Sequence, residues 1–309
     1  MRYWWMIALA IAAPGLPGFA ETAETPAEAR ETKRIVQHIS PLGLHRGGAK
    51  WRPEHTLETY LEAWERWPGA LMECDVHLTA DGVPVLHHDR TVDRTTDGTG
   101  PISSFTLEEV RALDAGYRFT RDDGETYPYR GQGLRIATLE EVLEALPDAY
   151  FLIEAKRSPG VVPAMVEVIR RLDAEERVLL ASFEPRFMAE LRRELPRAGH
   201  CFDFETGMEM LRALREGGEA WEQYEPADDV LALMMSLIRQ FQVTAEEIAA
   251  IRDKGVFVQL NTLDTAGEVQ RMLDLGADGL LTDRPDVVAP LLEEHMGLSF
   301  PRRTAGSAR

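Results

Sequence analysis

One stretch of the chain decides the fold: residues 71–86 read LMECDVHLTADGVPVL. Two apolar runs, 71–78 and 83–86, flank an Asp81-Gly82 turn signal, which is typical of a β-hairpin. A parallel neighbour would need a crossover of about a dozen residues or more. The second run is therefore predicted to be a hairpin arm and not a strand of a parallel sheet.

Outside this stretch, short β-like runs alternate with amphipathic segments, which indicates βαβ units and a parallel sheet. Nine strands are expected, at 39–44, 71–78, 83–86, 150–155, 178–182, 200–204, 230–235, 256–261 and 279–282. Helical faces are expected at Leu57, Tyr60, Leu61 and Trp64 and at Val162, Met165, Val166, Ile169 and Leu172, and capping boxes pair Thr106 with Glu109, Thr138 with Glu141 and Thr244 with Glu247. With the hairpin arm set aside, eight strands remain, so the predicted fold class is α/β, a (β/α)8 or TIM barrel.

The barrel is expected to fill residues 35–294 as one domain, because such barrels run to about 250 residues. Residues 90–137 are rich in turn signals and are predicted to form a small insertion after the second barrel strand. Residues 295–309 are expected to be a flexible tail.

The N-terminal segment has the pattern of a secretory signal. Residues 1–20 carry one early Arg, a short apolar run and small residues before the expected cleavage point. The apolar run is about half the length of about 20 residues that a membrane span needs, so no stable membrane anchor is expected. We expect an exported protein, periplasmic or secreted, with residues 21–34 as a mobile leader.

The composition of the chain argues against some classes of binding partner. The formal net charge of −18 argues against nucleic acid and anionic membrane surfaces, but not against a small anionic substrate that meets only its pocket. Two cysteines, Cys74 and Cys201, cannot form a disulfide framework. Two buried free thiols are expected, with a single bridge as the alternative, and no oligomeric state is predicted.

Three acidic residues lie where barrel enzymes place their reactive groups, at the C-terminal ends of strands. Strand alternation puts Glu73 and Asp75 on one face and Cys74 on the other, and Glu154 ends the third barrel strand. Alone, each acid also fits a salt-bridged or exposed position. Together they would be costly to bury unpaired, and carboxylates suit Mg²⁺ or Ca²⁺.

Basic residues end the same strands. His45 and Arg46 follow the first strand, His87 and His88 follow the hairpin arm, and Lys156 is one of only four lysines. Two separated histidines can act as acid and base, while Arg and Lys can hold an anion. The combination points to phosphate-ester chemistry.

The order of these motifs resembles that of glycerophosphodiester phosphodiesterases over residues 45–285. The motifs are His45-Arg46-Gly47, Pro53-Glu54-His55-Thr56, Glu73-x-Asp75, Asp81-Gly82, His88-Asp89, Arg94-Thr95-Thr96-x-Gly98-x-Gly100, Glu154-x-Lys156, Ser182-Phe183 and Thr282-Asp283-x-Pro285. The resemblance implies a TIM-barrel phosphodiesterase that uses one divalent cation, Mg²⁺ or Ca²⁺, and takes a small glycerophosphodiester as substrate.

Carried over by position, the resemblance implies a role for each motif residue. His45 and His88 match the acid/base pair, with His45 provisionally the base and His87 supporting. The metal ligands would be Glu73, Asp75 and Glu154, and the substrate-binding residues would be Arg46, Lys156 and Glu54.

Two departures from the family's motifs concern the substrate. His55 replaces the usual Asn, which could alter helix entry or offer a polar contact to the alcohol. The run Val258-Gln259-Leu260-Asn261 lacks the family's Trp, so an aromatic wall near the site is lost. A third departure, Ala137 in place of a Pro before a helix, is minor.

The expected reaction is metal-dependent hydrolysis of a glycerophosphodiester to glycerol 3-phosphate and an alcohol. In one route the glycerol hydroxyl beside the diester attacks phosphorus, and water then opens the cyclic phosphate. Two alternatives stay open: phospholipase C- or D-like cleavage of lysophospholipids or phospholipids, and an exported protein that binds phosphodiester or metal without turnover. The first would favour an apolar lip at the site, for which Tyr117, Phe119, Tyr127 and Tyr129 are available.

Overall fold

The computed structural model describes residues 33–300. Everything below concerns these residues. The expected signal sequence at 1–20, most of the expected leader and the last nine residues of the tail lie outside the described residues.

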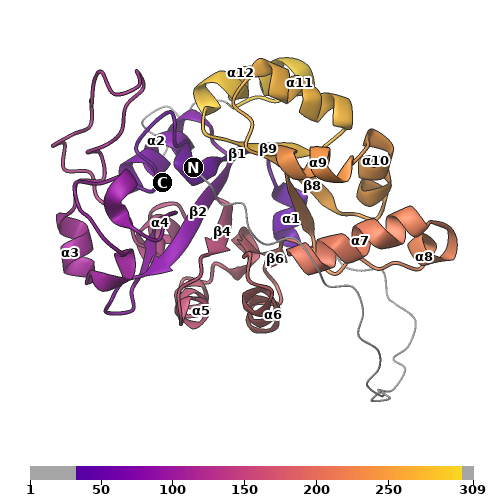
Figure 1. Cartoon of the computed structure of the whole chain (residues 1–309), viewed down its shortest axis with the longest axis horizontal. Helices are drawn as coiled ribbons and strands as arrows, with labels where there is room; N and C mark the ends of the chain where they lie inside the picture. Colours follow the sequence, from indigo (N-terminus) through magenta and orange to yellow (C-terminus); the bar gives the residue numbers. More distant parts are fainter. Residues whose placement is uncertain (1–32, 301–309) are drawn as a thin grey trace. The chain divides into compact units, whose positions relative to one another are not determined.

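The strands form a nearly closed parallel barrel, which confirms the predicted fold class (Figure 1). The order around the barrel is β6-β5-β4-β2-β1-β9-β8-β7, and a single parallel bridge between Cys201 and Val230 joins the two ends. The parallel strands are β1 (Leu42–Leu44), β2 (Leu71–Leu78), β4 (Phe151–Ala155), β5 (Val178–Ala181), β6 (Gly199–His200), β7 (Val230–Met234), β8 (Phe257–Asn261) and β9 (Gly279–Thr282).

The hairpin prediction is confirmed. β3 (Pro84–Leu86) pairs antiparallel with β2, with Val76 opposite Leu86, and lies outside the barrel path. The turn between them needs a left-handed residue, which Gly82 supplies at φ 82°. Thr79 donates to the Asp81 carboxylate at 2.6 Å inside this turn.

Helices follow the strands and cover the outside of the barrel (Figure 1). The three predicted capping boxes are present, and a fourth pairs Thr265 with Glu268. The helical face predicted at Leu57, Tyr60, Leu61 and Trp64 lies on α2 (Leu57–Arg66); Tyr60 and Trp64 are buried on it, while Leu61 at its edge is 38% exposed. The helices are α1 (Arg34–His38), α2 (Leu57–Arg66), α3 (Leu107–Ala112), α4 (Leu139–Ala145), α5 (Val161–Arg171), α6 (Pro185–Glu194), α7 (Phe204–Glu216), α8 (Gly218–Glu222), α9 (Met235–Phe241), α10 (Ala245–Asp253), α11 (Ala266–Leu275) and α12 (Pro285–Met296).

Two strands are three residues shorter than predicted, β1 and β6. Residues 39–41 connect α1 to β1, where Pro41 has no N–H to donate to a ladder. Strand β6 ends at His200, and Phe204 already belongs to α7, because the Asp203 carboxylate accepts from the first turn of that helix. At the other end of the chain, α12 continues through Met296, two residues into the expected tail.

Apolar side chains fill two layers. One cluster lies between the strands and the outer helices, and the second fills the barrel interior. α1 closes the N-terminal end of the barrel with Ile35, which packs in the interior cluster. Lys33 was assigned to the mobile leader, but its ammonium lies 2.8 Å from His200 Nδ1 and 3.1 Å from the Asp229 carboxylate.

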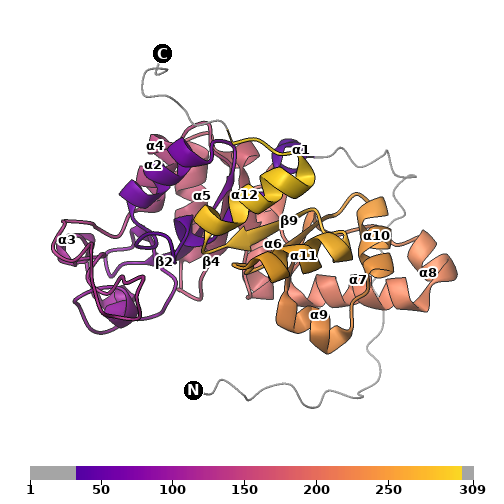
Figure 2. The same ribbon diagram turned by 90° about the horizontal axis from the view of Figure 1, so that it is seen from above.

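The insertion follows β3 and has its own small core around Val92, Ile102 and Val110. Two short 3-10 helices, η2 (Val92–Arg94) and η3 (Ile102–Ser104), and the helix α3 belong to it. Figures 1 and 2 both place α3 at one end of this unit and α7 and α8 at the other.

Candidate active site

The C-terminal edge of the barrel gathers the eight residues that the sequence singled out. They come from the ends of neighbouring strands β1, β2 and β4, from the loop before α2 and from the end of the hairpin arm β3. The eight are His45, Arg46, Glu54, Glu73, Asp75, His88, Glu154 and Lys156.

Strand pairing brings the three acids together. Glu73 and Asp75 are 3% and 1% exposed on the inner face of β2, while Cys74 packs among the outer helices. In the register of β2 and β4, Asp75 lies beside Glu154. The ammonium of Lys156 bridges these two carboxylates, at 2.8 Å from Asp75 and 2.7 Å from Glu154.

The loop after β1 folds back over the acids because three successive residues adopt left-handed backbone conformations. Arg46 has φ 54°, and Gly47 and Gly48 follow at 80° and 105°. The Arg46 backbone N–H therefore donates to Glu73 at 2.7 Å. Its guanidinium lies 3.3 Å from both the Glu54 and the Asp75 carboxylates.

The charges of this cluster are unevenly balanced. Burial, reinforced by the charge of Asp75, raises the pKa of Glu73 well above its ordinary value. Burial also raises the pKa of Glu154. For Asp75, burial acts in the same direction, but the positive charges around it, Lys156 foremost and Arg46 among them, together outweigh burial and lower the pKa. The positive groups near Glu73, His45 and Arg46, therefore do not offset its burial and the charge of Asp75.

Each of the two histidines is held by an aspartate through Nδ1. His45 Nδ1 lies 2.6 Å from Asp283, and His88 Nδ1 lies 2.8 Å from Asp89, which Arg94 holds at 2.6 Å. Such pairing fixes the tautomer and leaves Nε2 for proton transfer. Burial lowers the pKa of His45, but the hydrogen bond to Asp283 and the charge of Glu73 outweigh burial and raise it.

Several residues that hold the site had no predicted role. Asp283 and Asp89 orient the two histidines, and Arg94 binds Glu54 through two hydrogen bonds of 2.7 and 2.8 Å. Arg94 and Arg46 hold the pKa of the buried Glu54 carboxyl at about 2 despite its burial. Asp283, Asp89 and Arg94 all stand in the motifs quoted above. Their positions within those motifs were the signal by which these roles could have been found.

The His55 side chain is buried against β2. The ring is 1% exposed, and Nε2 accepts the backbone N–H of Asp75 at 3.2 Å. Burial lowers the pKa of His55 to about 3, so the ring is neutral. It lies behind the acids and is not placed to contact an alcohol. His87 is also buried, with Nε2 3.0 Å from the Thr91 carbonyl oxygen.

The donor chemistry fits a hard divalent cation. Asp75 Oδ2 is buried without a hydrogen-bond partner, and the raised pKa of Glu73 marks a missing counter-charge. Across residues 33–300, no three His, Cys, Asp or Glu side chains converge closely enough to hold a metal ion as they stand. The Lys156 ammonium lies between Asp75 and Glu154, so a cation there would have to displace it from at least one carboxylate.

The remaining sequence predictions near the site have clear outcomes. Both cysteines are buried free thiols, as expected. Gln259, in the run that lacks the family's Trp, is fully buried, and neither end of its amide has a hydrogen-bond partner. Within the described part of the chain, no helix is long and apolar enough to cross a membrane.

Comparison with known proteins gives the family. The profile of the glycerophosphoryl diester phosphodiesterase family matches residues 45–287. A glycerophosphodiester phosphodiesterase of Caldanaerobacter subterraneus subsp. tengcongensis is 32% identical over 260 residues, covering 81% of this chain and 96% of that protein. One from Bacillus subtilis is 27% identical, covering 91% of this chain and 96% of the relative.

Solved structures show the same fold. A glycerophosphoryl diester phosphodiesterase domain from Mycobacterium tuberculosis matches with a TM-score of 0.70 and 22% identity, over 82% of this chain and 98% of that chain. An Oleispira antarctica phosphodiesterase, solved in complex with the product sn-glycerol-3-phosphate, matches with a TM-score of 0.65 and 21% identity, over 83% and 98%. With its barrel and its strand-end cluster, the chain belongs to the glycerophosphoryl diester phosphodiesterase family and is a phosphoric diester hydrolase.

Proposed function

We propose that this enzyme hydrolyses glycerophosphodiesters to sn-glycerol 3-phosphate and a free alcohol by acid-base catalysis with His45 and His88. One observation carries the proposal: two aspartate-held histidines flank a cluster of three carboxylates, an arginine and a lysine. The two histidines interact with different acids. His45 interacts electrostatically with Glu73, and His88 with Asp75 and Glu154. The product bound by the Oleispira relative supports the same products here.

We assign each residue's role from its position in the site. We expect Arg46 and Lys156 to bind the phosphoryl oxygens. One histidine takes the proton of the attacking hydroxyl, either the glycerol 2-hydroxyl or water. The other gives a proton to the alcohol oxygen as its bond to phosphorus breaks. When the glycerol hydroxyl attacks first, water then opens the cyclic phosphate.

Glu73, Asp75 and Glu154 would hold one divalent cation, Mg²⁺ or Ca²⁺, which supplies positive charge to the phosphoryl oxygens. We expect turnover of glycerophosphocholine to disappear in EDTA and to return when Mg²⁺ or Ca²⁺ is added. Full turnover in EDTA would refute the metal requirement. Choline release separates the enzyme from a protein that only binds its ligand.

The histidine roles are tested with two leaving groups. His45→Ala and His88→Ala are compared on glycerophosphocholine and on the p-nitrophenyl ester of glycerol phosphate. Loss of the acid matters less for p-nitrophenol, which leaves without a proton, so one variant should recover activity on that ester and the other should not. His295→Ala, at an exposed position on α12, is the matched control. Near wild-type turnover by both site variants would refute the assignment.

We also propose that the protein is exported, to the periplasm or the medium, after removal of residues 1–20. The residue pattern of that segment supports this proposal. N-terminal sequencing of the exported protein should begin at Glu21. A full-length chain retained in the cytoplasm would refute export.

A further inference from the structure

Two charged side chains stand behind the aspartate that holds His45. Asp264 lies in the loop between β8 and α11, and Lys50 lies in the loop after β1. Neither residue belongs to the motifs by which the chain resembles its family. Both reach Asp283 in the loop after β9, and strands β8, β9 and β1 are neighbours in the barrel. The three loops therefore meet beside one of the two proposed catalytic histidines.

The Asp264 carboxylate fixes the backbone that carries Asp283. Its Oδ1 accepts the Asp283 backbone N–H at 2.9 Å and the Thr282 hydroxyl at 3.0 Å. The Thr282 hydroxyl also accepts the backbone N–H of Arg284 at 2.9 Å, so its own proton points to Asp264. Residues 282–284 are thus tied to one carboxylate oxygen, either directly or through this hydroxyl.

Lys50 closes the other side of Asp283. Its backbone N–H donates to the Asp283 carbonyl oxygen at 3.0 Å. Its ammonium lies 2.5 Å from Asp264 Oδ2 and 3.4 Å from Asp283 Oδ2. The other oxygen of Asp283, Oδ1, lies 2.6 Å from His45 Nδ1. Each oxygen of the Asp283 carboxylate therefore has a partner in the loop after β1, and the direction of its hydrogen bond to His45 is set.

Only a few charged groups act on this pair. Those that act on His45 are Asp283 from the loop after β9, Glu73 from β2 and Arg46 from its own loop. Those that act on Asp283 are His45, Lys50 and Arg46. Burial raises the pKa of Asp283, but the hydrogen bond to His45 and these positive charges outweigh burial and lower it. The Lys50 side chain is 60% exposed, so its share of the effect is screened by salt.

We propose that Asp264, held by Lys50, is a positioning residue that aims the Asp283 carboxylate at His45, while the Lys50 ammonium offsets part of the Asp283 charge. This inference rests on the proposed function, in which His45 transfers a proton. Both oxygens of Asp264 are engaged by the partners described above, and its side chain is 16% exposed. Asp264 therefore acts through Asp283 and not on the substrate, by keeping the imidazole aligned for proton transfer.

The first test removes the Asp264 carboxylate. Choline release from glycerophosphocholine by the full-length enzyme with its divalent cation is measured for Asp264→Ala and Asp264→Asn. The alanine variant should lose about 10- to 100-fold in kcat with little change in KM, because His45 is less well aligned while the groups that bind phosphate stay in place. The asparagine variant keeps an oxygen for the Asp283 N–H and the Thr282 hydroxyl, so it should recover most of the lost kcat.

Asp278→Ala is the matched control for this test. Asp278 joins the same two strands at their other end, because its carboxylate accepts the Val258 N–H at 2.9 Å and binds Arg252 at 2.7 Å. Its removal should lower stability but leave kcat unchanged. The inference is overturned if folded Asp264→Ala keeps the wild-type kcat, if Asp264→Asn loses as much as the alanine variant, or if Asp278→Ala loses as much. Thermal melting shows which variants are folded.

The second test removes the Lys50 charge and does not depend on the folding of Asp264→Ala. In Lys50→Met the Asp283 carboxylate stabilises the His45 imidazolium more strongly. The acid limb of the kcat/KM profile should therefore move to higher pH, by about half a unit at low salt. The shift should shrink in about 1 M salt, where the Debye length is about 3 Å. Limbs that stay at the wild-type pH at low salt would overturn the inference.

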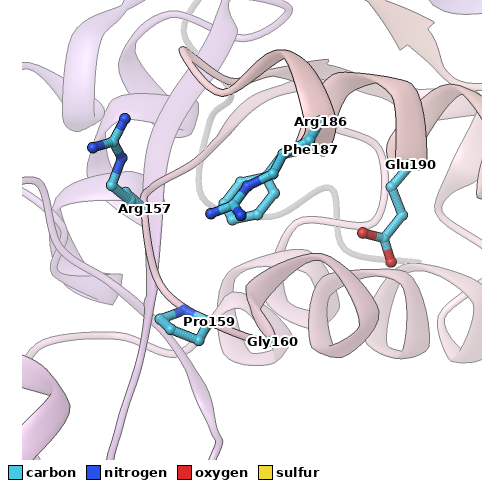
Figure 3. Close-up of a pocket in the computed structure, with 6 residues that line it drawn as sticks. All are labelled: Arg157, Pro159, Gly160, Arg186, Phe187 and Glu190. Carbon is cyan, nitrogen blue, oxygen red and sulfur yellow. The ribbon is translucent and has the colours of Figure 1, made fainter.

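Arg186→Met is the matched control for Lys50→Met. The Arg186 side chain is also a cation at the C-terminal edge of the barrel, 74% exposed, with Nε 3.9 Å from Glu184. It lines a cavity of about 400 Å³ between the loop after β4 and the start of α6, where Figure 3 shows it beside the Phe187 ring. The variant should leave both limbs of the profile at the wild-type pH. A shift equal to that of Lys50→Met would show an effect of net charge alone and would overturn the inference.

His45→Ala separates failure of this inference from failure of the proposed function. If His45→Ala keeps near wild-type turnover, the proposed function fails. If His45→Ala loses its turnover while the Asp264 and Lys50 variants behave as the wild type does, only the inference is overturned.

Discussion

Removing the Lys156 ammonium tests how the acidic cluster is balanced. Lys156 lies 2.8 Å from Asp75 and 2.7 Å from Glu154, and its side chain is 13% exposed. Lys156→Met keeps the chain length and apolar stem but leaves both carboxylates without this partner. The variant should therefore be less stable than the wild type in EDTA, and a divalent cation should restore most of the loss.

The magnitude follows from the burial of the pair. Breaking a buried ion pair from one side costs about 3–5 kcal/mol. Glu154 is 18% exposed and can take up a proton, so we expect about 3 kcal/mol here. For a domain of this size that lowers Tm by about 6–12 °C. A cation stabilises both proteins, so the gap narrows only as far as the variant binds it more tightly. Binding that is about 30-fold tighter, because no ammonium competes, recovers about 2 kcal/mol.

The assay is thermal unfolding of wild type and variant in EDTA and in saturating Mg²⁺ or Ca²⁺. The difference in Tm between the two proteins should be about 6–12 °C in EDTA. With the cation it should shrink until it corresponds to about 1 kcal/mol in the free energy of unfolding. Lys254→Met is the matched control, since Lys254 bonds only a surface carbonyl oxygen of Glu222 and the Trp221 ring among its described contacts. A variant as stable as wild type in EDTA, or a gap that the cation leaves unchanged, would refute this reasoning.

Three further predictions concern other parts of the molecule. Asp283→Asn should lower kcat/KM by about 10²–10⁴-fold. The acid limb of the pH profile should move to lower pH, because His45 loses the hydrogen bond that raises its pKa. An acid limb at the wild-type pH would contradict this. Burial lowers the pKa of His200 to about 3, so the unfolded chain binds the extra proton below pH 6.5, and stability should fall by up to about 1.4 kcal/mol per pH unit between pH 6.5 and 3. Urea unfolding at pH 7.5 and 5.5 measures this, and His200→Gln should show a shallower fall. Gly43→Ala should cost about 1–3 kcal/mol in urea unfolding, since the added Cβ would lie 2.9 Å from the Leu280 carbonyl oxygen; an unchanged midpoint would contradict this.

Much of the fold could be predicted because it depends on local patterns. The hairpin at residues 71–86 follows from two apolar runs and a turn signal a few residues apart. Capping boxes such as Thr138 with Glu141 likewise use residues three apart. Leu61 shows the limit of such patterns, since helical spacing cannot tell which edge of an apolar stripe the core covers.

The site was predictable for the residues that stand at strand ends. Alternation along β2 placed Glu73 and Asp75 on one face, and parallel pairing then set Glu154 beside Asp75. The partners of these residues could not be derived from the pattern. Asp283 lies 238 residues from His45, and only closure of the barrel brings their side chains to 2.6 Å.

By itself, the sequence determined the order of strands and helices and the chemical types of the side chains at the strand ends, because both depend on residues only a few positions apart. Tertiary structure decided which of these groups meet and with what charge. The pairing of β2 with β4 placed Lys156 between two acids, and burial left Glu73 with a raised pKa. The physical reason is that burial and the distances between charges depend on contacts between segments far apart in the chain, and no local pattern encodes them.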